Sequence, residues 1–234
     1  MSSPAASRPD VGVVIVAAGA GVRAGPGEPK QFRSILGVPM LLRALRPFTS
    51  HPDVLQVVVV LPRAYAERPP EWLGKLVGER LSLVAGGEHR FQSVRAGVRA
   101  LPAGAAVVLV HDAARPFVVR GTVDEVIARA RAGVGAVASV PMGDTVKEVV
   151  DGNRVGRTVP RERLWRAQTP QGFPRAMLDA AYATGDGAPV PTDDGELCER
   201  AGFPVEVVAD SVLNLKITTP DDFRIAEALA RELR

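Results

Sequence analysis

Short runs of β-branched residues alternate with helical patterns along most of this chain, and this alternation limits the folds open to it. The first run, Val11–Ala17, is apolar and ends at glycines, as expected for a strand buried on both faces of a sheet. Similar runs recur at 56–61, 81–85, 106–110 and 135–140. Apolar residues at helical spacing, for example from Phe91 to Leu101 and from Val123 to Ala130, lie between them. The order predicts an α/β fold, a mainly parallel sheet with helices on both faces.

The alternation breaks after the fifth run, where a β-hairpin is predicted. Two β-prone segments, 146–150 and 154–159, are separated by Asp-Gly-Asn at 151–153, and Asp-Gly is a strong hairpin signal. A further β-prone segment follows at 164–168. We expect an inserted arm, at about residues 142–170, that projects from the sheet. A solvated surface hairpin is the alternative at this point. Because an isolated two-stranded ribbon is marginal in water, the arm favours a homodimer in which a second subunit covers it.

Helical patterns resume after the arm and enclose one more strand candidate. The helices are expected near 174–182, 193–201 and 220–233, and the strand at 205–209. The first ten residues, 1–10, are rich in Ser, Pro and Ala and are interpreted as a disordered tail. With no internal repeat or linker in view, residues 11–234 are interpreted as a single domain.

Charge and composition narrow the classes of partner. The chain holds 29 basic and 26 acidic residues that are interspersed, without the basic run and aromatics that a nucleic-acid groove needs. The longest strongly apolar run, 11–18, is far shorter than the ~20 residues that span a bilayer. Cys198 is the only cysteine, so an internal disulfide is impossible, and we interpret it as a structural thiol. We therefore expect a cytoplasmic protein that binds small polyanions, with no nucleic-acid or membrane partner.

A glycine-rich loop follows the first strand and matches part of a dinucleotide-binding fingerprint, Gly19-x-Gly21-x-x-Ala24. Two prolines, Pro26 and Pro29, prevent the immediate helix that such a site requires. The second strand ends in Leu61-Pro62 and supplies no acidic residue for a ribose hydroxyl. A Walker A loop is excluded because the lysine of this loop is followed by glutamine and lacks the preceding glycine.

The remaining interpretation of this loop is a site for a triphosphate. Its backbone N–H groups would surround the phosphates while Arg23 and Lys30 balance their charge. A purely structural turn is the alternative at this point.

Two other loops follow strands in the same manner. Residues 86–90 come after the third strand and open a helix that carries Ser93, and residues 111–116 come after the fourth. In open α/β sheets ligands bind at the carboxyl ends of strands, so all three loops should converge on one crevice. His111 alone would more often be a packed histidine, and Arg90 alone a solvated side chain; their shared position is the evidence for a site.

Taken together, these segments resemble the 2-C-methyl-D-erythritol 4-phosphate cytidylyltransferase (IspD) family. The matching patterns are A-A-G-x-G-x-R at 17–23, P-K-Q at 29–31, G-G-x-x-R-x-x-S-V at 86–94, H-D-A-A-R-P at 111–116, D-T-x-K at 144–147, L-W-x-A-x-T-P-Q at 164–171, T-D-D at 192–194 and N-x-K-(I/V)-T at 214–218. The six-residue run at 111–116 is the most specific. Ala24 departs from the family, which often has methionine there, and this concerns local packing more than chemistry.

The resemblance implies a Rossmann-like sheet, dimerisation through the arm, and transfer of CMP from CTP to 2-C-methyl-D-erythritol 4-phosphate. The products would be 4-diphosphocytidyl-2-C-methyl-D-erythritol and pyrophosphate, in non-mevalonate isoprenoid biosynthesis, with Mg²⁺ bridging the triphosphate. D-ribitol 5-phosphate is the closest alternative acceptor, and the loops do not separate the two. A nucleotidyltransferase for another base is disfavoured by 86–93 and 111–116.

The resemblance also implies residue roles. Catalytic residues, which would neutralise the developing charge, are Arg23, Lys30 and Lys216. Positions that would bind CTP are Ala17, Ala18, Gly19, Gly21, Arg23, Lys30, Gly86, Gly87, Glu88, Arg90, Ser93, Asp112 and Lys216. Positions that would hold the acceptor are Asp112, Arg115, Thr145, Arg161 and Thr192, and Asp112 is also implied near the metal. Thr145 and Arg161 lie on the arm and would reach the neighbouring subunit's site. A binding module without catalysis is disfavoured because the charged residues of the site are present together.

Overall fold

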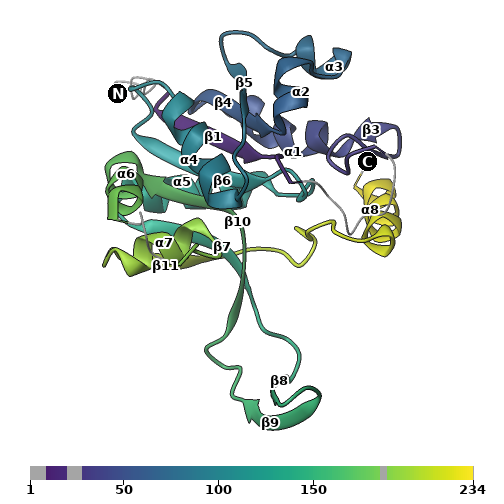
Figure 1. Cartoon of the computed structure of the whole chain (residues 1–234), viewed down its shortest axis with the longest axis vertical. Helices are drawn as coiled ribbons and strands as arrows, with labels where there is room; N and C mark the ends of the chain where they lie inside the picture. The colour runs from purple at the N-terminus through teal and green to yellow at the C-terminus, as the bar shows by residue number, and fades with distance from the viewer. Residues whose placement is uncertain (1–8, 20–27, 185–188, 234) are drawn as a thin grey trace, which may run out of the picture.

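A seven-stranded, mostly parallel sheet forms the centre of the molecule, with strand order β11-β7-β10-β6-β1-β4-β5 (Figure 1). The computed structural model describes residues 9–19, 28–184 and 189–233. The strands of the sheet are β1 Val11–Val16, β4 Val54–Leu61, β5 Leu81–Ala85, β6 Val107–Asp112, β7 Gly135–Pro141, β10 Trp165–Pro174 and β11 Val205–Ala209. The predicted strands are confirmed, and so is the mainly parallel α/β class.

Helices cover both faces of the sheet because alternate residues of its strands point to opposite sides. On one face, Val13 and Ile15 of β1 belong to a core shared with α1 (Met40–Thr49) and α5 (Arg120–Arg131). On the other face, Val14 packs with residues of the helices that follow later strands. These helices are α4 Arg90–Ala100, α6 Arg175–Thr184 and α7 Asp194–Arg200. Because both faces of the sheet are packed against helices, the carboxyl ends of the strands are held in place, and the loops of the predicted site begin there.

Strand β10 departs from the sequence prediction. It runs antiparallel between β6 and β7 and continues to Pro174, six residues beyond the predicted 164–168. Proline and glycine in its second half are unfavourable for a strand pattern. Phe173 is nonetheless fully buried and pairs with Val108, so tertiary burial outweighs local propensity here.

Smaller elements flank the sheet and were not predicted. They are the two-residue strands β2 Ser34–Ile35 and β3 Val38–Pro39 and the short helices α2 Arg63–Glu67 and α3 Glu71–Gly74. The last helix, α8 Pro220–Glu232, begins at a capping box between Thr219 and Asp222. It packs with β2 and the loop after β6 in a separate apolar cluster that contains Ile35, Phe117 and Ile217.

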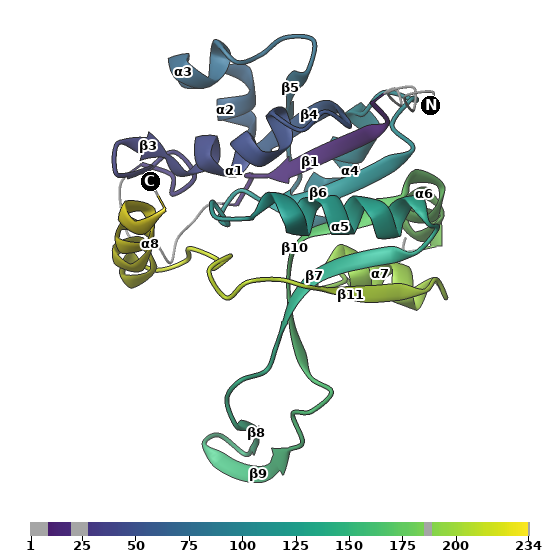
Figure 2. The same cartoon turned by 180° about the vertical axis from the view of Figure 1, so that it is seen from behind.

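The predicted hairpin is present as β8 (Val146–Val150) and β9 (Arg154–Val159). Its turn has left-handed residues, with φ of 45° at Asp151 and 80° at Gly152, as the Asp-Gly signal requires. The arm extends well away from the sheet (Figures 1 and 2). It exposes the apolar side chains of Val149 and Val155, each 53% accessible. Dimerisation through the arm stays a prediction.

The remaining predictions on chain organisation are only partly covered by the described residues. Most of the tail predicted at 1–10 lies outside them, and the single domain at 11–234 stays a prediction. Within the described ranges, no helix combines the length and apolar character needed to span a bilayer.

Candidate active site

A cavity of about 400 Å³ opens at the carboxyl ends of β1, β5 and β6. The loops that follow these strands form its walls together with a segment that precedes α8, so the predicted convergence of three loops is confirmed. Residues proposed from the sequence that line it are Ala17, Ala18, Gly19, Lys30, Gly87, Glu88, Arg90, Ser93, Asp112 and Lys216. Gly21 and Arg23 lie outside the described residues.

The loop after β5 packs tightly against the start of α4. A Cβ atom on Gly86 would approach the Cβ of Ala18 to 2.5 Å and the Oγ of Ser93 to 2.7 Å, so this position has no space for a side chain. The backbone N–H of Gly87 donates to Ser93 Oγ at 3.2 Å, and Ser93 Oγ donates to the carbonyl of His89 at 3.1 Å. Backbone therefore forms this wall of the cavity, next to a helix N-terminus that favours an anion.

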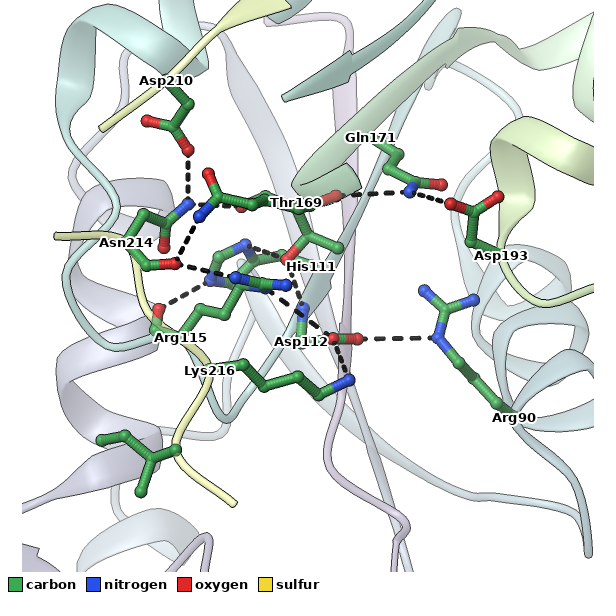
Figure 3. Close-up of polar contacts among 12 residues, drawn as sticks. Arg90, His111, Asp112, Arg115, Thr169, Gln171, Asp193, Asp210, Asn214 and Lys216 are labelled. Atoms are coloured by element: carbon green, nitrogen blue, oxygen red, sulfur yellow. Dashed lines mark hydrogen bonds and ion pairs between the residues drawn. The ribbon is translucent and has the colours of Figure 1, made fainter. Parts of the chain in front are cut away.

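Asp112, at the end of β6, is the centre of a cluster of cations (Figure 3). Its Oδ2 lies 2.8 Å from Lys216 Nζ and 4.0 Å from Arg115 Nε, and its Oδ1 lies 3.6 Å from Arg90 Nε. Burial alone would raise the pKa of this carboxyl group, but Arg90 and Lys216 outweigh it and hold the pKa well below its usual range. The carboxylate is thus ionised at neutral pH.

Arg90 joins Asp112 to the buried start of α7. Its Nη1 lies 2.8 Å from Asp194 Oδ2, and the Tyr182 hydroxyl donates to Asp194 Oδ1 at 3.2 Å. Burial lowers the pKa of Arg90, but the charges of Asp194 and Asp112 more than compensate and raise it. Arg90 is therefore a fixed cation at the cavity wall rather than a solvated surface side chain.

His111 is packed in the core, which is the role expected for this histidine when it is considered alone. It is fully buried, and burial lowers its pKa to about 4, so the ring is neutral at pH 7. Its Nε2 donates to the Arg115 carbonyl at 3.0 Å, which leaves Nδ1 to accept from Thr169 Oγ1 at 3.0 Å. Thr169 Oγ1 in turn accepts the backbone N–H of Asp112 at 3.0 Å. The histidine thereby orients the Asp112 backbone.

The segment before α8 is tied to the loop after β6. Asn214 is fully buried, and its Nδ2 donates to the Thr169 carbonyl at 2.8 Å and to Asp210 Oδ2 at 2.6 Å. Arg115 Nη1 donates to the Asn214 carbonyl at 2.7 Å. These contacts fix the backbone from which Lys216 reaches Asp112.

Lys30 approaches the same place from the first loop. Its Nζ donates to the Ile217 carbonyl at 3.0 Å, one residue beyond Lys216. The amide of the neighbouring Gln31 donates to the Ala17 carbonyl at 2.9 Å, which anchors the loop to the end of β1. Two lysines far apart in the sequence therefore flank the cavity.

The residues expected to hold the acceptor are not all brought together. Arg115 lies beside Asp112 and is only 8% exposed. Thr145 and Arg161 lie on the arm, and Thr192 is exposed and donates its hydroxyl to Glu196 Oε2 at 2.7 Å. None of these three lines the cavity within the described part of one chain. Their proposed roles stay predictions.

Several buried polar residues that organise the site had no role assigned from the sequence. Gln171 of β10 accepts the backbone N–H groups of Asp194 and Gly195 at 3.1 and 3.0 Å and donates to Asp193 Oδ2 at 2.9 Å. It thereby fixes the start of α7, which holds Arg90. Gln171 and Asp194 fall within the sequence patterns noted above, but only the fold shows that both are buried and paired.

The donor chemistry of the cavity fits a magnesium ion bound with phosphates. No group of three or more potential metal ligands occurs among the described residues. The carboxylates on the cavity wall are those of Asp112 and Glu88. Mg²⁺ in nucleotide sites is commonly held by one or two carboxylates together with substrate phosphates. Asp112, ionised and at the end of a strand, meets that requirement.

Comparison with known proteins agrees over nearly the whole chain. The family model of 2-C-methyl-D-erythritol 4-phosphate cytidylyltransferase matches residues 11–232. Curated relatives with that name from Syntrophus aciditrophicus and Frankia casuarinae are 39% and 43% identical; the matches cover 96% and 97% of this chain and 97% and 83% of the relatives. The crystal structure of the enzyme of that name from Thermus thermophilus is 37% identical, with a TM-score of 0.80 over 95% of this chain and 99% of that chain. This chain therefore belongs to the 2-C-methyl-D-erythritol 4-phosphate cytidylyltransferase (IspD) family.

Proposed function

We propose that this chain transfers CMP from CTP to 2-C-methyl-D-erythritol 4-phosphate, with release of pyrophosphate, in isoprenoid biosynthesis. The observation that carries the proposal is the cavity at the carboxyl edge of the sheet, where Lys30 and Lys216 flank the ionised Asp112. A family member with these charged groups in place is equipped to bring two phosphorylated substrates together.

The nucleotide would occupy the cavity of about 400 Å³. Because Gly86 has no side chain, the backbone at this position would approach the cytosine base closely. Backbone carbonyl groups and the Ser93 hydroxyl suit the amino group and ring edge of cytosine. The triphosphate would extend along the first loop, with Ala17, Ala18 and Gly19 supplying backbone and Lys30 a positive charge. Arg23 and Gly21 are proposed for the same loop from the sequence.

The chemistry requires no protein nucleophile. An oxygen of the acceptor's phosphate would attack the α-phosphorus of CTP, a new P–O–P bond would form, and the bond from the α-phosphorus to the bridging oxygen would break. Pyrophosphate leaves with the electron pair of that bond. Catalysis is then positioning and charge stabilisation, which Lys30, Lys216 and Arg23 would provide.

A magnesium ion would be held by Asp112 together with substrate phosphate oxygens. Bound there, it would supply charge neutralisation to the triphosphate. Asp112 itself, fixed through its backbone by Thr169 and through its carboxylate by Lys216, would also orient hydroxyls of the acceptor.

The functional unit would be a homodimer joined through the arm. Support comes from the extended hairpin and from Val149 and Val155, which are half-exposed on it and would be covered by a partner. Thr145 and Arg161 would then contact the acceptor in the neighbouring subunit. We also propose a cytoplasmic location, where nucleoside triphosphates are available, testable by cell fractionation.

The test is pyrophosphate release from CTP and Mg²⁺ in the presence of methylerythritol phosphate. The control arms replace the acceptor with D-ribitol 5-phosphate and CTP with ATP, GTP or UTP. We expect release with CTP and methylerythritol phosphate at a rate at least about a hundredfold above the other pairs, the discrimination that unpaired buried polar groups impose. Equal or faster release with ribitol phosphate would overturn the assigned acceptor, and no release with CTP would overturn cytidylyl transfer.

A further inference from the structure

The crossover between β4 and β5 brings two aromatic side chains to the loop that carries Lys30. Tyr65 lies on α2 and Trp72 on α3, and both are half-buried against the core cluster that contains Phe32. The ring centroid of Phe32 lies 4.9 Å from that of Tyr65 and 6.5 Å from that of Trp72. Aromatic rings at these separations attract each other beyond the area that they bury. Tyr65 and Trp72 therefore form an aromatic support for Phe32.

Phe32 is the last residue of a tight turn at 30–32. Its backbone N–H donates to the Pro29 carbonyl at 2.9 Å, and the N–H of Arg33 donates to the Lys30 carbonyl at 3.2 Å. Phe32 is only 3% exposed, so the core sets its place. Because both hydrogen bonds span the turn, a shift of Phe32 moves the backbone of Lys30 with it.

Three consecutive side chains of this turn are anchored in three different places. Lys30 Nζ donates to the Ile217 carbonyl at 3.0 Å. Gln31 Nε2 donates to the Ala17 carbonyl at 2.9 Å. Both of these side chains line the proposed nucleotide cavity, whereas Phe32 is packed in the core on the aromatic support. The turn is thus held at the cavity by polar contacts and in the core by ring contacts.

The position of the Lys30 backbone matters for the chemistry. A lysine carries its charge at the end of a flexible four-carbon stem, so the ammonium group can be placed accurately only if the backbone beneath it is fixed. Misplacement of a reacting group by about 1 Å can lower a rate by about a hundredfold. Whatever holds the turn therefore influences the charge that meets the triphosphate.

We propose that Phe32 is a positioning residue, which sets the place of Lys30 through the turn at 30–32, and that the aromatic support holds Phe32 in place. The crossover between β4 and β5 then serves the reaction as well as the fold. Phe32 acts on catalysis through Lys30 and touches neither substrate. The proposal rests on the proposed cytidylyl transfer, in which Lys30 stabilises charge on the triphosphate.

Phe32→Leu tests this role, because leucine keeps the site apolar and removes the ring contacts. Phe173→Leu is the matched control, since Phe173 is fully buried and packs at Gly135, the first residue of β7. Pyrophosphate release at saturating acceptor gives kcat and the KM for CTP, and thermal unfolding gives Tm. We expect Phe32→Leu to lower kcat about tenfold and to change the CTP KM by less than about threefold, the size of lost aromatic contacts.

The control separates this effect from a general loss of stability. Phe173→Leu should lower Tm at least as much as Phe32→Leu, while its kcat stays within about twofold of wild type. Tyr65→Leu leaves Phe32 in place but removes part of the aromatic support, and should lower kcat about threefold. An equal fall of kcat in Phe32→Leu and Phe173→Leu would overturn the proposal.

A double-mutant cycle with Lys30→Ala distinguishes positioning from damage elsewhere in the site. If Phe32 acts through Lys30, then Phe32→Leu has nothing left to disturb once the lysine is gone. The kcat of the double variant should therefore equal that of Lys30→Ala within about twofold. A further loss of about tenfold in the double variant, as independent effects would give, would show that Phe32 is merely structural.

Calorimetric binding of CTP with Mg²⁺ to the same four proteins repeats the cycle without turnover. We expect the CTP affinity to fall about tenfold in Lys30→Ala, about threefold in Phe32→Leu, and no further in the double variant than in Lys30→Ala. Additive losses of affinity would contradict the positioning role. If the losses are not additive but wild type releases no pyrophosphate with any acceptor, the proposed reaction is wrong and the positioning of Lys30 by Phe32 stands.

Discussion

Lys216 Nζ lies 2.8 Å from Asp112 Oδ2, although the two residues are separated by more than a hundred positions in the chain. Lys216 is 42% exposed at its side chain, whereas the Asp112 side chain is 11% exposed. The lysine is thus held by a buried anchor while its ammonium group still borders the cavity. This is the arrangement expected for a cation that must meet an incoming phosphate.

Replacing either lysine at the cavity should abolish most of the activity without unfolding the chain. Lys216→Ala and Lys30→Ala are each expected to lower kcat by about a hundredfold or more, because each removes a charge that stabilises the transition state. Steady-state pyrophosphate release measures the loss, and circular dichroism checks the fold. Lys75→Ala is the matched control and should retain wild-type rates, since Lys75 follows α3 as its C-cap residue and its side chain is 71% exposed. Near-normal kcat in both cavity variants would contradict the assigned mechanism.

The neutral, buried His111 makes a defined contribution to the pH dependence of stability. Its folded pKa of about 4 lies below the ordinary value of 6.5, so between these values the unfolded chain binds a proton that the folded chain does not. Stability from this residue is therefore complete above pH 6.5 and is lost as the pH falls toward 4, by about 3 kcal/mol in total.

Urea unfolding of wild type and His111→Gln at pH 7 and pH 4.5 measures this contribution. His111→Gln should be less stable at pH 7, because it loses packing and hydrogen bonds, but its further decline on acidification should be smaller than that of wild type. Identical pH slopes in the two proteins would show that His111 does not titrate as its burial requires.

If the arm completes the neighbouring subunit's site, then defects in different subunits should complement each other. Arg161→Ala alters the arm, and Lys216→Ala alters the core of the site. Each variant alone should be nearly inactive at limiting acceptor concentrations. Mixed and reassociated subunits should recover about a quarter of the wild-type rate, since half of the dimers are mixed and each has one intact site.

Analytical ultracentrifugation of the same mixtures shows whether dimers have formed. Dimers without recovered activity would place Arg161 outside a shared site. A fully active wild-type monomer would contradict the role of the arm altogether.

Cys198 should take no part in the reaction. Its side chain is fully buried, and burial raises the pKa of the thiol to about 12, so almost no thiolate forms at neutral pH. We expect kcat and KM of Cys198→Ser to match wild type and iodoacetamide to modify the folded wild-type protein far more slowly than the urea-unfolded protein. Rapid alkylation of the folded protein with loss of activity would refute this.

The sequence was informative wherever the physical signal is local. Parallel strands buried on both faces leave runs such as Val11–Val16, and their carboxyl ends locate the loops of the site. The turn at Asp151 and Gly152 is equally predictable from the sequence, because few residue types adopt left-handed conformations. These features account for the confirmed fold and for the position of the cavity.

The sequence gives no signal for side-chain contacts that depend on tertiary packing. Nothing local to Arg90 shows that α7 will bring a buried Asp194 to it. Strand β10 past residue 168 was missed because Pro170 and Gly172 obscure a strand that exists only between two neighbours.

The position of β10 in the sheet constrains the order in which the strands can assemble. Strand β10 separates β6 from β7 and pairs with both, although it follows them in the chain. During synthesis β5, β4, β1 and β6 can associate early, but β7 has no neighbour until the ribosome has released residues up to Pro174. Thr169, whose hydroxyl oxygen accepts the backbone N–H of Asp112, belongs to the same strand. Insertion of β10 therefore joins β7 to the rest of the sheet and brings Thr169 to the site together, while β11 and Lys216 follow later in the chain.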